Sequence, residues 1–241
     1  MSCVALILAA GQETIGVNNM PKPFVSVQDK PVLMYTLEVF EQNPMVDSIH
    51  LVCLDGWTEI ARAYARQYNI SKLGGIVTGG ESVQETIFKG LLSLKQELLD
   101  DDLVIVHDGI RPLVEDSVLN DVIKIAEEKG NAVSSMPNNE QVFVVNKKDP
   151  RTTVQFIPRE TIKRVSTPQA YHFGELLEAY EYAFEHSLGI VGPQYADTLF
   201  SDLGKKIYFS AGSDKNIKMN TEEDLRLFEA YLNRSKDLWL K

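Results

Sequence analysis

Residues 9–24 combine small side chains with a lysine, as a phosphate site requires. Residues 9–16 read Ala-Ala-Gly-Gln-Glu-Thr-Ile-Gly, and Lys22 follows in Pro-Lys-Pro-Phe. A turn of small residues after a buried strand lets backbone N–H groups approach a phosphate, and a nearby lysine can neutralise its charge. The segment lacks the Gly-x-Gly-x-x-Gly fingerprint and the Lys-Ser/Thr of a P-loop. An ordinary turn with a solvated Lys22 is therefore an open alternative.

The segment His-Asp-Gly-Ile-Arg-Pro at residues 107–112 brings an acid and an arginine together after an apolar run. Asp108 could hold Mg²⁺, and Arg111 could bind a phosphate through two parallel hydrogen bonds. A salt bridge between these two side chains would explain the same spacing without a ligand. Further along, residues 167–169 could form a turn, Asp197 a helix cap, and Lys218 an edge-strand charge.

Short apolar runs alternate with segments of helical period through the first 135 residues. Four such strand–helix repeats predict an α/β fold, with a mostly parallel sheet flanked by helices on both faces. Ligands of such sheets bind beyond the carboxyl ends of the strands. The unusual residues follow the first, third and fourth strands, at 10–23, 79–80 and 108–112. We expect strands at residues 3–9, 49–53, 75–77, 103–107 and 132–135, and helices at 31–41, 58–67, 83–98 and 117–128.

The pattern changes near residue 137. Residues 141–145 and 152–156 are rich in β-branched and aromatic side chains around a charged turn, which predicts a projecting hairpin. This arm would expose Val142, Val144, Val154 and Phe156 in a monomer, so we expect a homodimer through it. No linker or repeat divides the chain, which predicts one domain over residues 1–241 with a β-arm at about 137–160. A helix at 173–185, strands at 206–210 and 217–219, and a closing helix at 221–232 should follow.

Composition and charge exclude several classes of protein. The chain has 24 Lys+Arg against 34 Asp+Glu, a net charge of −10, which argues against a nucleic-acid partner. Its apolar runs are far shorter than the ~20 residues of a spanning helix, and no signal peptide is evident. The two cysteines lie in apolar runs, and the four histidines lack the spacing of a zinc site. We therefore expect a cytoplasmic protein without a membrane partner.

Taken in chain order, these segments form part of a longer series of motifs. The series resembles the cytidylyltransferases that act on sugar-alcohol phosphates, and it implies their Rossmann-like nucleotidyltransferase fold. Two known branches use 2-C-methyl-D-erythritol 4-phosphate and ribitol 5-phosphate, and Gly56-Trp57 resembles the ribitol branch. The motifs are Ala9-Ala10-Gly11, Pro21-Lys22-x-Phe24, Lys30-Pro31-Val32, Gly79-Gly80, Gly90-Leu91, His107-Asp108-x-x-Arg111-Pro112, Arg159 before Thr167-Pro168-Gln169, and Asn216-Ile217-Lys218 with Thr221 and Asp224.

The resemblance implies transfer of CMP from CTP to an alcohol phosphate, with pyrophosphate leaving and Mg²⁺ as cofactor. The product would feed surface-polymer synthesis or, in the methylerythritol branch, isoprenoid synthesis. The substrate's own phosphate oxygen attacks, so catalysis depends on positioning and charge neutralisation. The resemblance assigns nucleotide binding to Ala9, Ala10, Gly11, Gly79, Gly80 and Thr86, catalysis to Lys22, Asp108 and Lys218, metal binding to Asp108, and alcohol-phosphate binding to Arg111, Arg159 and Asp197, with the last two acting across the dimer interface.

The first loop departs from the family pattern Ala-Ala-Gly-x-Gly-x-Arg-Met-Gly. It loses an arginine and gains a carboxylate, whereas most alcohol-phosphate residues remain. An arginine missing at a transferring phosphate can cost about 10³–10⁵ in rate. The substituted positions are Glu13 and Val17 for glycines, Ile15 for arginine, Pro23 for glutamine, Val83 for arginine, Thr86 for serine, and Ala196 for threonine.

Three hypotheses remain open at this point. The chain could be a cytidylyltransferase for a polyol phosphate such as ribitol 5-phosphate, the methylerythritol enzyme, or an impaired homologue that binds an alcohol phosphate without catalysis. A dinucleotide oxidoreductase matches the sheet pattern but lacks the glycine fingerprint. The enzymatic hypotheses require Lys22, Arg111, Arg159 and Lys218 to converge on one cleft.

Overall fold

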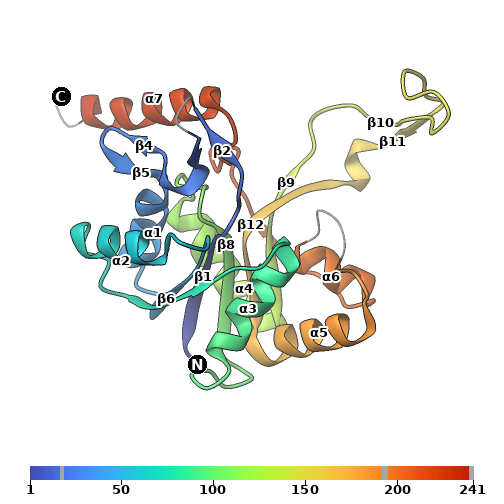
Figure 1. The fold of residues 1–241 in the computed structure, drawn as a ribbon. Helices are drawn as coiled ribbons and strands as arrows, with labels where there is room; N and C mark the ends of the chain where they lie inside the picture. The colour runs from blue at the N-terminus through green and yellow to red at the C-terminus, as the bar shows by residue number, and fades with distance from the viewer. Residues whose placement is uncertain (17–18, 191–194, 239–241) are drawn as a thin grey trace.

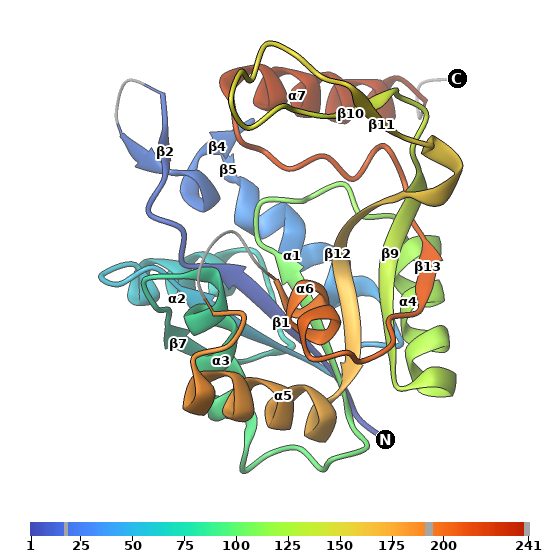
Figure 2. The same ribbon diagram turned by 90° about the vertical axis from the view of Figure 1, so that its right-hand side faces the viewer.

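The computed structural model describes residues 1–16, 19–190 and 195–238. Its centre is a seven-stranded sheet of order β13-β9-β12-β8-β1-β6-β7, with β13 and β7 at opposite edges (Figure 2). Among the described strands of this sheet, β12 alone runs antiparallel to its neighbours. The predicted mostly parallel α/β sheet is therefore confirmed. The strands are β1 (Cys3–Ala9), β6 (Ser48–Cys53), β7 (Leu73–Thr78), β8 (Leu103–Asp108), β9 (Asn131–Pro137), β12 (Lys163–His172) and β13 (Phe209–Ala211).

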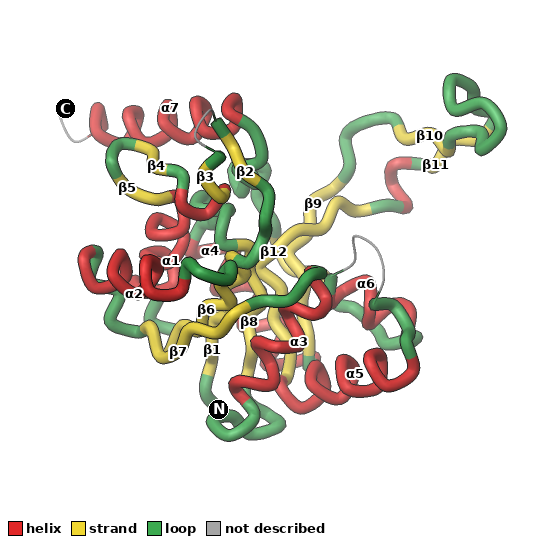
Figure 3. Tube along the Cα trace, viewed as in Figure 1, coloured by secondary structure: helices red, strands yellow, loops and turns green. Residues whose placement is uncertain are grey.

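Alternate side chains of β1 belong to two opposite cores, because successive residues of a strand point to opposite faces. Ala5 and Ile7 pack with residues of α1 (Val32–Gln42), α2 (Thr58–Gln67) and α4 (Asp116–Lys129). Val4 and Leu6 pack with residues of α3 (Val83–Leu94), α5 (Phe173–His186) and α6 (Ala196–Asp202). Figure 3 shows α1 and α2 on one side of the sheet and α5 and α6 on the other. Both faces are thus covered, and the ends of the strands are left for a site.

The arm leaves the sheet after β9 and returns at the start of β12 (Figure 1). It contains the hairpin β10 (Val142–Val144) and β11 (Gln155–Ile157), followed by the short helix η2 (Arg159–Thr161). The predicted hairpin is confirmed. Phe143, Val154 and Phe156 are 55%, 101% and 60% exposed. The homodimer through this arm and the single domain over residues 1–241 stay predictions.

The chain between β1 and α1 folds into short elements that lie at the end of the sheet. They are β2 (Thr14–Ile15), β3 (Met20–Pro21), η1 (Lys22–Phe24), β4 (Ser26–Val27) and β5 (Lys30–Pro31). The closing helix α7 (Glu222–Leu238) covers this region, because Phe228 packs with Val27, Val32 and Met219 in a small third core. In the part of the chain that the structure describes, no helix has both the length and the apolar character to cross a bilayer.

Two expectations about the second half of the chain are wrong. Residues 217–219 form no strand; they are irregular, and the Met219 N–H donates to the Ile110 carbonyl over 2.9 Å. Residues 167–169 are not a turn but lie inside β12, where Thr167 and Gln169 are buried. The arm joins the end of β9 to the start of β12, so β12 runs antiparallel to β9 and also to β8.

Candidate active site

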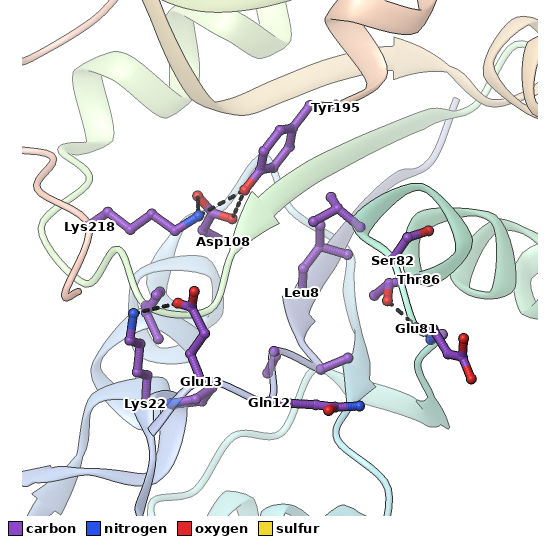
Figure 4. Close-up of a pocket in the computed structure, with 17 residues that line it drawn as sticks. Leu8, Gln12, Glu13, Lys22, Glu81, Ser82, Thr86, Asp108, Tyr195 and Lys218 are labelled. Carbon is purple, nitrogen blue, oxygen red and sulfur yellow. Dashed lines mark hydrogen bonds and ion pairs between the residues drawn. The ribbon is translucent and has the colours of Figure 1, made fainter. Parts of the chain in front are cut away.

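A cleft of about 540 Å³ opens at the carboxyl ends of β1, β7 and β8 (Figure 4). This is the edge that the strand–helix pattern predicts for a ligand. Five of its lining residues carry charged side chains: Glu13, Lys22, Glu81, Asp108 and Lys218. The wall is lined by Leu8, Ala9, Ala10, Gly11, Gln12, Glu13, Lys22, Pro23, Gly80, Glu81, Ser82, Val83, Thr86, Asp108, Ile110, Tyr195 and Lys218.

Lys22 stands on η1 at one side of the cleft, and its ammonium group is already paired. Its Nζ lies 2.5 Å from Glu13 Oε2 and donates to Asn220 Oδ1 over 3.3 Å. The side chain of Lys22 is 12% exposed, whereas that of Glu13 is 78% exposed. Phe24, two residues after Lys22, is buried and stacks on Trp57, with ring centroids 4.4 Å apart. The stack fixes η1, and Glu13 occupies the position from which an anionic ligand would reach Lys22.

Asp108 lies at the end of β8 and gathers three partners around its carboxylate. Its Oδ2 accepts from Arg111 Nε over 2.8 Å and lies 3.3 Å from Lys218 Nζ. Its Oδ1 accepts from the Tyr195 hydroxyl over 3.1 Å, and Lys218 Nζ donates to that hydroxyl over 2.8 Å. The open alternative, in which Asp108 and Arg111 pair with each other, is therefore what the structure contains.

Opposite charges keep this cluster ionised against the effect of burial. Burial disfavours the charged form of Asp108, but Lys218 and Arg111 outweigh it and lower the pKa of the carboxyl. Burial likewise opposes the charge of Lys218, yet Asp108 and the Tyr195 hydroxyl raise its pKa. The pKa of Glu13 is lowered by its hydrogen bond and charge interaction with Lys22. At neutral pH the cleft therefore holds two ammonium groups, each beside a carboxylate.

The small residues around the cleft have two different reasons for being small. A Cβ on Gly11 would meet no atom within 4 Å, so this turn faces open space. A Cβ on Gly79 would lie 2.2 Å from Ala10 Cβ, so Gly79 is needed for the packing of two turns. Gly80 lines the cleft, and its N–H donates to Thr86 Oγ1 over 3.1 Å. Thr86 therefore supports this turn at the edge of the cleft.

Arg111 stands behind Asp108 rather than on the cleft wall, and its Nη1 donates to the Asn216 carbonyl over 2.8 Å. Two other expected substrate residues lie outside this cleft. Arg159 is exposed on η2 of the arm, where its Nη1 donates to the Asn139 carbonyl over 3.4 Å. Asp197 is 6% exposed at the start of α6, and burial raises its pKa. The expected convergence of Lys22, Arg111, Arg159 and Lys218 on one cleft stays a prediction. The lining contains Lys22 and Lys218, Arg111 stands behind Asp108, and Arg159 lies on the arm, from which it is expected to act across a dimer interface.

Sequence reasoning missed Tyr195 and the pairing of Glu13 with Lys22. Tyr195 stands two residues before Asp197, but nothing in its neighbours marks it as a site residue. The altered loop pattern marks Glu13 as unusual, but it does not identify Lys22 as its partner. The third altered position of that loop, Val17, lies outside the described residues.

The arrangement is suited to binding a polyanion rather than to activating a protein nucleophile. Two ammonium groups face a cleft whose floor is a small-residue turn, the components of a phosphate site. Among the residues that the structure describes, no cluster of three or more His, Cys, Asp or Glu side chains could hold a metal ion. A cation on Asp108 would have to displace Arg111, Lys218 or Tyr195.

Comparison with known proteins gives consistent results over nearly the whole chain. The sequence profile of the family described as IspD, 2-C-methyl-D-erythritol 4-phosphate cytidylyltransferase, matches residues 3–234. The chain is 45% identical over 234 residues to the ribitol-5-phosphate cytidylyltransferase of Lacticaseibacillus paracasei, covering 97% of this chain and 99% of that protein. It is 30% identical over 230 residues to the 2-C-methyl-D-erythritol 4-phosphate cytidylyltransferase of Clostridium botulinum, covering 95% and 96%. The crystal structure of 4-diphosphocytidyl-2C-methyl-D-erythritol synthase from Anaerococcus prevotii has the same fold, with a TM-score of 0.80 at 22% identity and 96% coverage of both chains.

Proposed function

The chain belongs to the 2-C-methyl-D-erythritol 4-phosphate cytidylyltransferase family, and we propose that it transfers CMP from CTP to a polyol phosphate such as ribitol 5-phosphate. The observation that carries this proposal is the pair of ammonium groups, Lys22 and Lys218, in one cleft at the carboxyl edge of the sheet. The 45% identity to a ribitol-5-phosphate enzyme supports the polyol. The Gly56-Trp57 pair also resembles the ribitol branch, and Trp57 stacks on Phe24, two residues after Lys22.

In the proposed reaction, a phosphate oxygen of the alcohol phosphate attacks the α-phosphorus of CTP. A new P–O bond forms while the bond from the α-phosphorus to the bridging oxygen breaks, and pyrophosphate leaves with the bond electrons. The attacking oxygen is already anionic, so no side chain has to remove a proton. Lys22 would hold the triphosphate and Lys218 would face the α-phosphate, where both offset charge in the transition state. The turn from Ala9 to Gly11, with Gly80, would receive the nucleotide.

Magnesium enters this proposal as part of the nucleotide substrate. The carboxylate of Asp108 is occupied by Arg111, Lys218 and Tyr195, so Asp108 would act by orienting cations. A divalent ion bound to the triphosphate would lower the charge that must approach Glu13. Omitting Mg²⁺ from an otherwise complete assay, with EDTA present, should abolish turnover. Undiminished turnover without the metal would contradict this part of the proposal.

We also propose a cytoplasmic homodimer in which the arm brings Arg159 to the partner's cleft. The exposed apolar side chains of the arm support this assembly, because a monomer would leave them in water. Within the described part of its own chain, the Arg159 guanidinium makes one long hydrogen bond, of 3.4 Å to the Asn139 carbonyl. Both cysteines are free and buried, which agrees with a reducing compartment.

The proposal is tested by incubating the purified protein with CTP, Mg²⁺ and each candidate alcohol phosphate. We expect pyrophosphate release and formation of a CDP-alcohol, detected by mass spectrometry, with ribitol 5-phosphate preferred in kcat/KM over 2-C-methyl-D-erythritol 4-phosphate. The Lys218→Ala variant is the control, and its rate should fall by about 10²–10³. Folded protein that releases no pyrophosphate with any of these substrates would refute the enzymatic function.

A non-catalytic homologue is the second candidate, and the Glu13–Lys22 pair is the observation that favours it. If this pair blocks the triphosphate permanently, the protein should bind an alcohol phosphate but not CTP. Calorimetric titration with CTP and Mg²⁺ separates the two functions, because the enzyme must bind both ligands. Saturable CTP binding would exclude the non-catalytic alternative in this form.

A further inference from the structure

Tyr195 has a firmly anchored backbone at the edge of the cleft. It precedes the first residue of α6, where its N–H and carbonyl both contact Thr198 Oγ1 at 2.8 Å. The same carbonyl accepts from Gln84 Nε2 over 3.3 Å, and Gln84 Oε1 in turn accepts from the Tyr180 hydroxyl over 2.5 Å. Tyr195 is thus tied to both α3 and α5. Its ring projects from a fixed point toward the charged cluster (Figure 4).

The Tyr195 hydroxyl stands between two opposite charges. It donates to Asp108 Oδ1 over 3.1 Å and accepts from Lys218 Nζ over 2.8 Å. The direct separation of Lys218 Nζ from Asp108 Oδ2 is longer, at 3.3 Å. A phenol has one donor hydrogen, and here that hydrogen goes to Asp108 while a lone pair serves Lys218. The hydroxyl therefore shares the ammonium group with the carboxylate.

Removing the Tyr195 hydroxyl would change the hydrogen bonds of Asp108 and draw Lys218 toward its carboxylate. Oδ1 would lose its donor, and Lys218 would lose the shorter of its two contacts. Arg111 already occupies Oδ2 at 2.8 Å, so the vacated Oδ1 becomes the available acceptor for Lys218. An ammonium in direct contact with a buried carboxylate is held more strongly than one shared with a phenol. Lys218 would then be withdrawn from the cleft.

We propose that Tyr195 is a positioning residue for Lys218: its hydroxyl holds the ammonium at the cleft wall, short of full contact with Asp108, so that the ammonium stays within reach of the ligand's phosphate. This inference rests on the proposed function in that Lys218 is taken to face the α-phosphate. Lys22 and the turn after β1 hold the rest of the nucleotide. The contribution of Tyr195 should therefore appear in kcat rather than in the KM for CTP.

The test is Tyr195→Phe, which removes one oxygen and keeps the ring. We expect kcat to fall roughly tenfold, the size of one hydrogen bond to a charged group, with the KM for CTP changed by less than about threefold. In a Lys218→Ala background the same substitution should cause no further loss, because its target is gone. An equal loss in both backgrounds would overturn the proposal, since Tyr195 would then act on the substrate or on stability.

The matched control is Tyr35→Phe. It removes a hydroxyl that lies outside the cleft and donates to the Val27 carbonyl over 2.9 Å. It should leave kcat and KM unchanged. Crystal structures of the wild type and Tyr195→Phe give a readout that does not need turnover. The distance from Lys218 Nζ to the nearer Asp108 oxygen should shorten from 3.3 Å to about 2.8 Å. If Lys218 stays in place in Tyr195→Phe, the positioning role of Tyr195 is refuted, whether or not the protein has cytidylyltransferase activity. If Lys218 moves but the protein shows no activity, only the proposed function is refuted.

Discussion

Replacing Glu13 by glutamine tests whether the divergent first loop opposes nucleotide binding. In the structure, the Glu13 carboxylate pairs with Lys22 at 2.5 Å, on the side of the cleft where a triphosphate would bind. Glu13→Gln keeps the size of the side chain and removes its charge. Two effects then favour CTP together: Lys22 loses a competing partner, and the repulsion between a carboxylate and a polyanion disappears.

The magnitude follows from charge separation and exposure. A unit charge about 5 Å from a phosphate contributes roughly 0.8 kcal/mol in bulk water and about 3 kcal/mol at an effective dielectric constant of 20. Because the Glu13 side chain is 78% exposed, the value should lie near the lower end. An effect of about 0.8–1.4 kcal/mol corresponds to a roughly four- to tenfold tighter Kd.

Calorimetric titration of CTP with Mg²⁺, at low and at high salt, measures this effect. The gain should shrink as salt rises, because the Glu13 charge is solvent-exposed and screening shortens its range. Glu59→Gln on α2 is the matched control: it changes the net charge equally, and its carboxylate is 84% exposed and pairs with Arg62 at 3.8 Å. Unchanged or weaker CTP binding by Glu13→Gln, or an equal gain in Glu59→Gln, would refute the reasoning.

Three further predictions address the loop, the arm and a buried histidine. Ile15→Arg combined with Glu13→Gly should raise turnover at least tenfold if the loop after β1 lacks only the arginine of the family pattern. No gain in pyrophosphate release would mean that this loop works by another geometry. Phe156→Asp should convert the dimer to a monomer in light scattering, since it charges an apolar side chain that is 60% exposed on the arm; a wild type that elutes as a monomer would contradict the dimer. Burial lowers the pKa of His107 from 6.5 to about 4. Between these two pH values the imidazole is protonated in the unfolded chain but not in the folded protein. The free energy of unfolding should therefore fall as the pH decreases, by up to about 1.4 kcal/mol per pH unit. His107→Gln should flatten this dependence in urea unfolding between pH 7 and 5, and an unchanged slope would assign it to other groups.

The strand β12 and the segment around Lys218 show where local patterns failed. Residues 163–172 carry charged residues, a proline and a glutamine, so no apolar run marks them as a strand in the middle of a sheet. Their burial comes from β8 and β9 on either side, which are distant in sequence. Residues 217–219 look like a strand because of Ile217 and Met219, but these side chains pack with α7 in the third core. In both cases long-range packing decided the backbone conformation, and periodicity contains no information about it.

What the sequence determined by itself is the mostly parallel sheet and the edge of that sheet at which a ligand site is expected. Apolar runs and helical periods are local properties, and the connection rules for parallel strands convert them into a topology. They place Ala10, Gly11, Gly80 and Asp108 around one opening. The family motifs added Lys22 and Lys218, whose convergence on that opening no local pattern supplies.

Only the tertiary structure decided which charges face which. Glu13 reaches Lys22 across nine residues, and Tyr195 meets Asp108 across 87. Such pairs depend on the angle at which each element leaves the core, a quantity set by the packing of helices on the sheet. The same packing buries Asp197 behind the wall and leaves Arg159 out on the arm. The sequence therefore determines which residue types form the site, whereas the fold determines which partner each of them contacts.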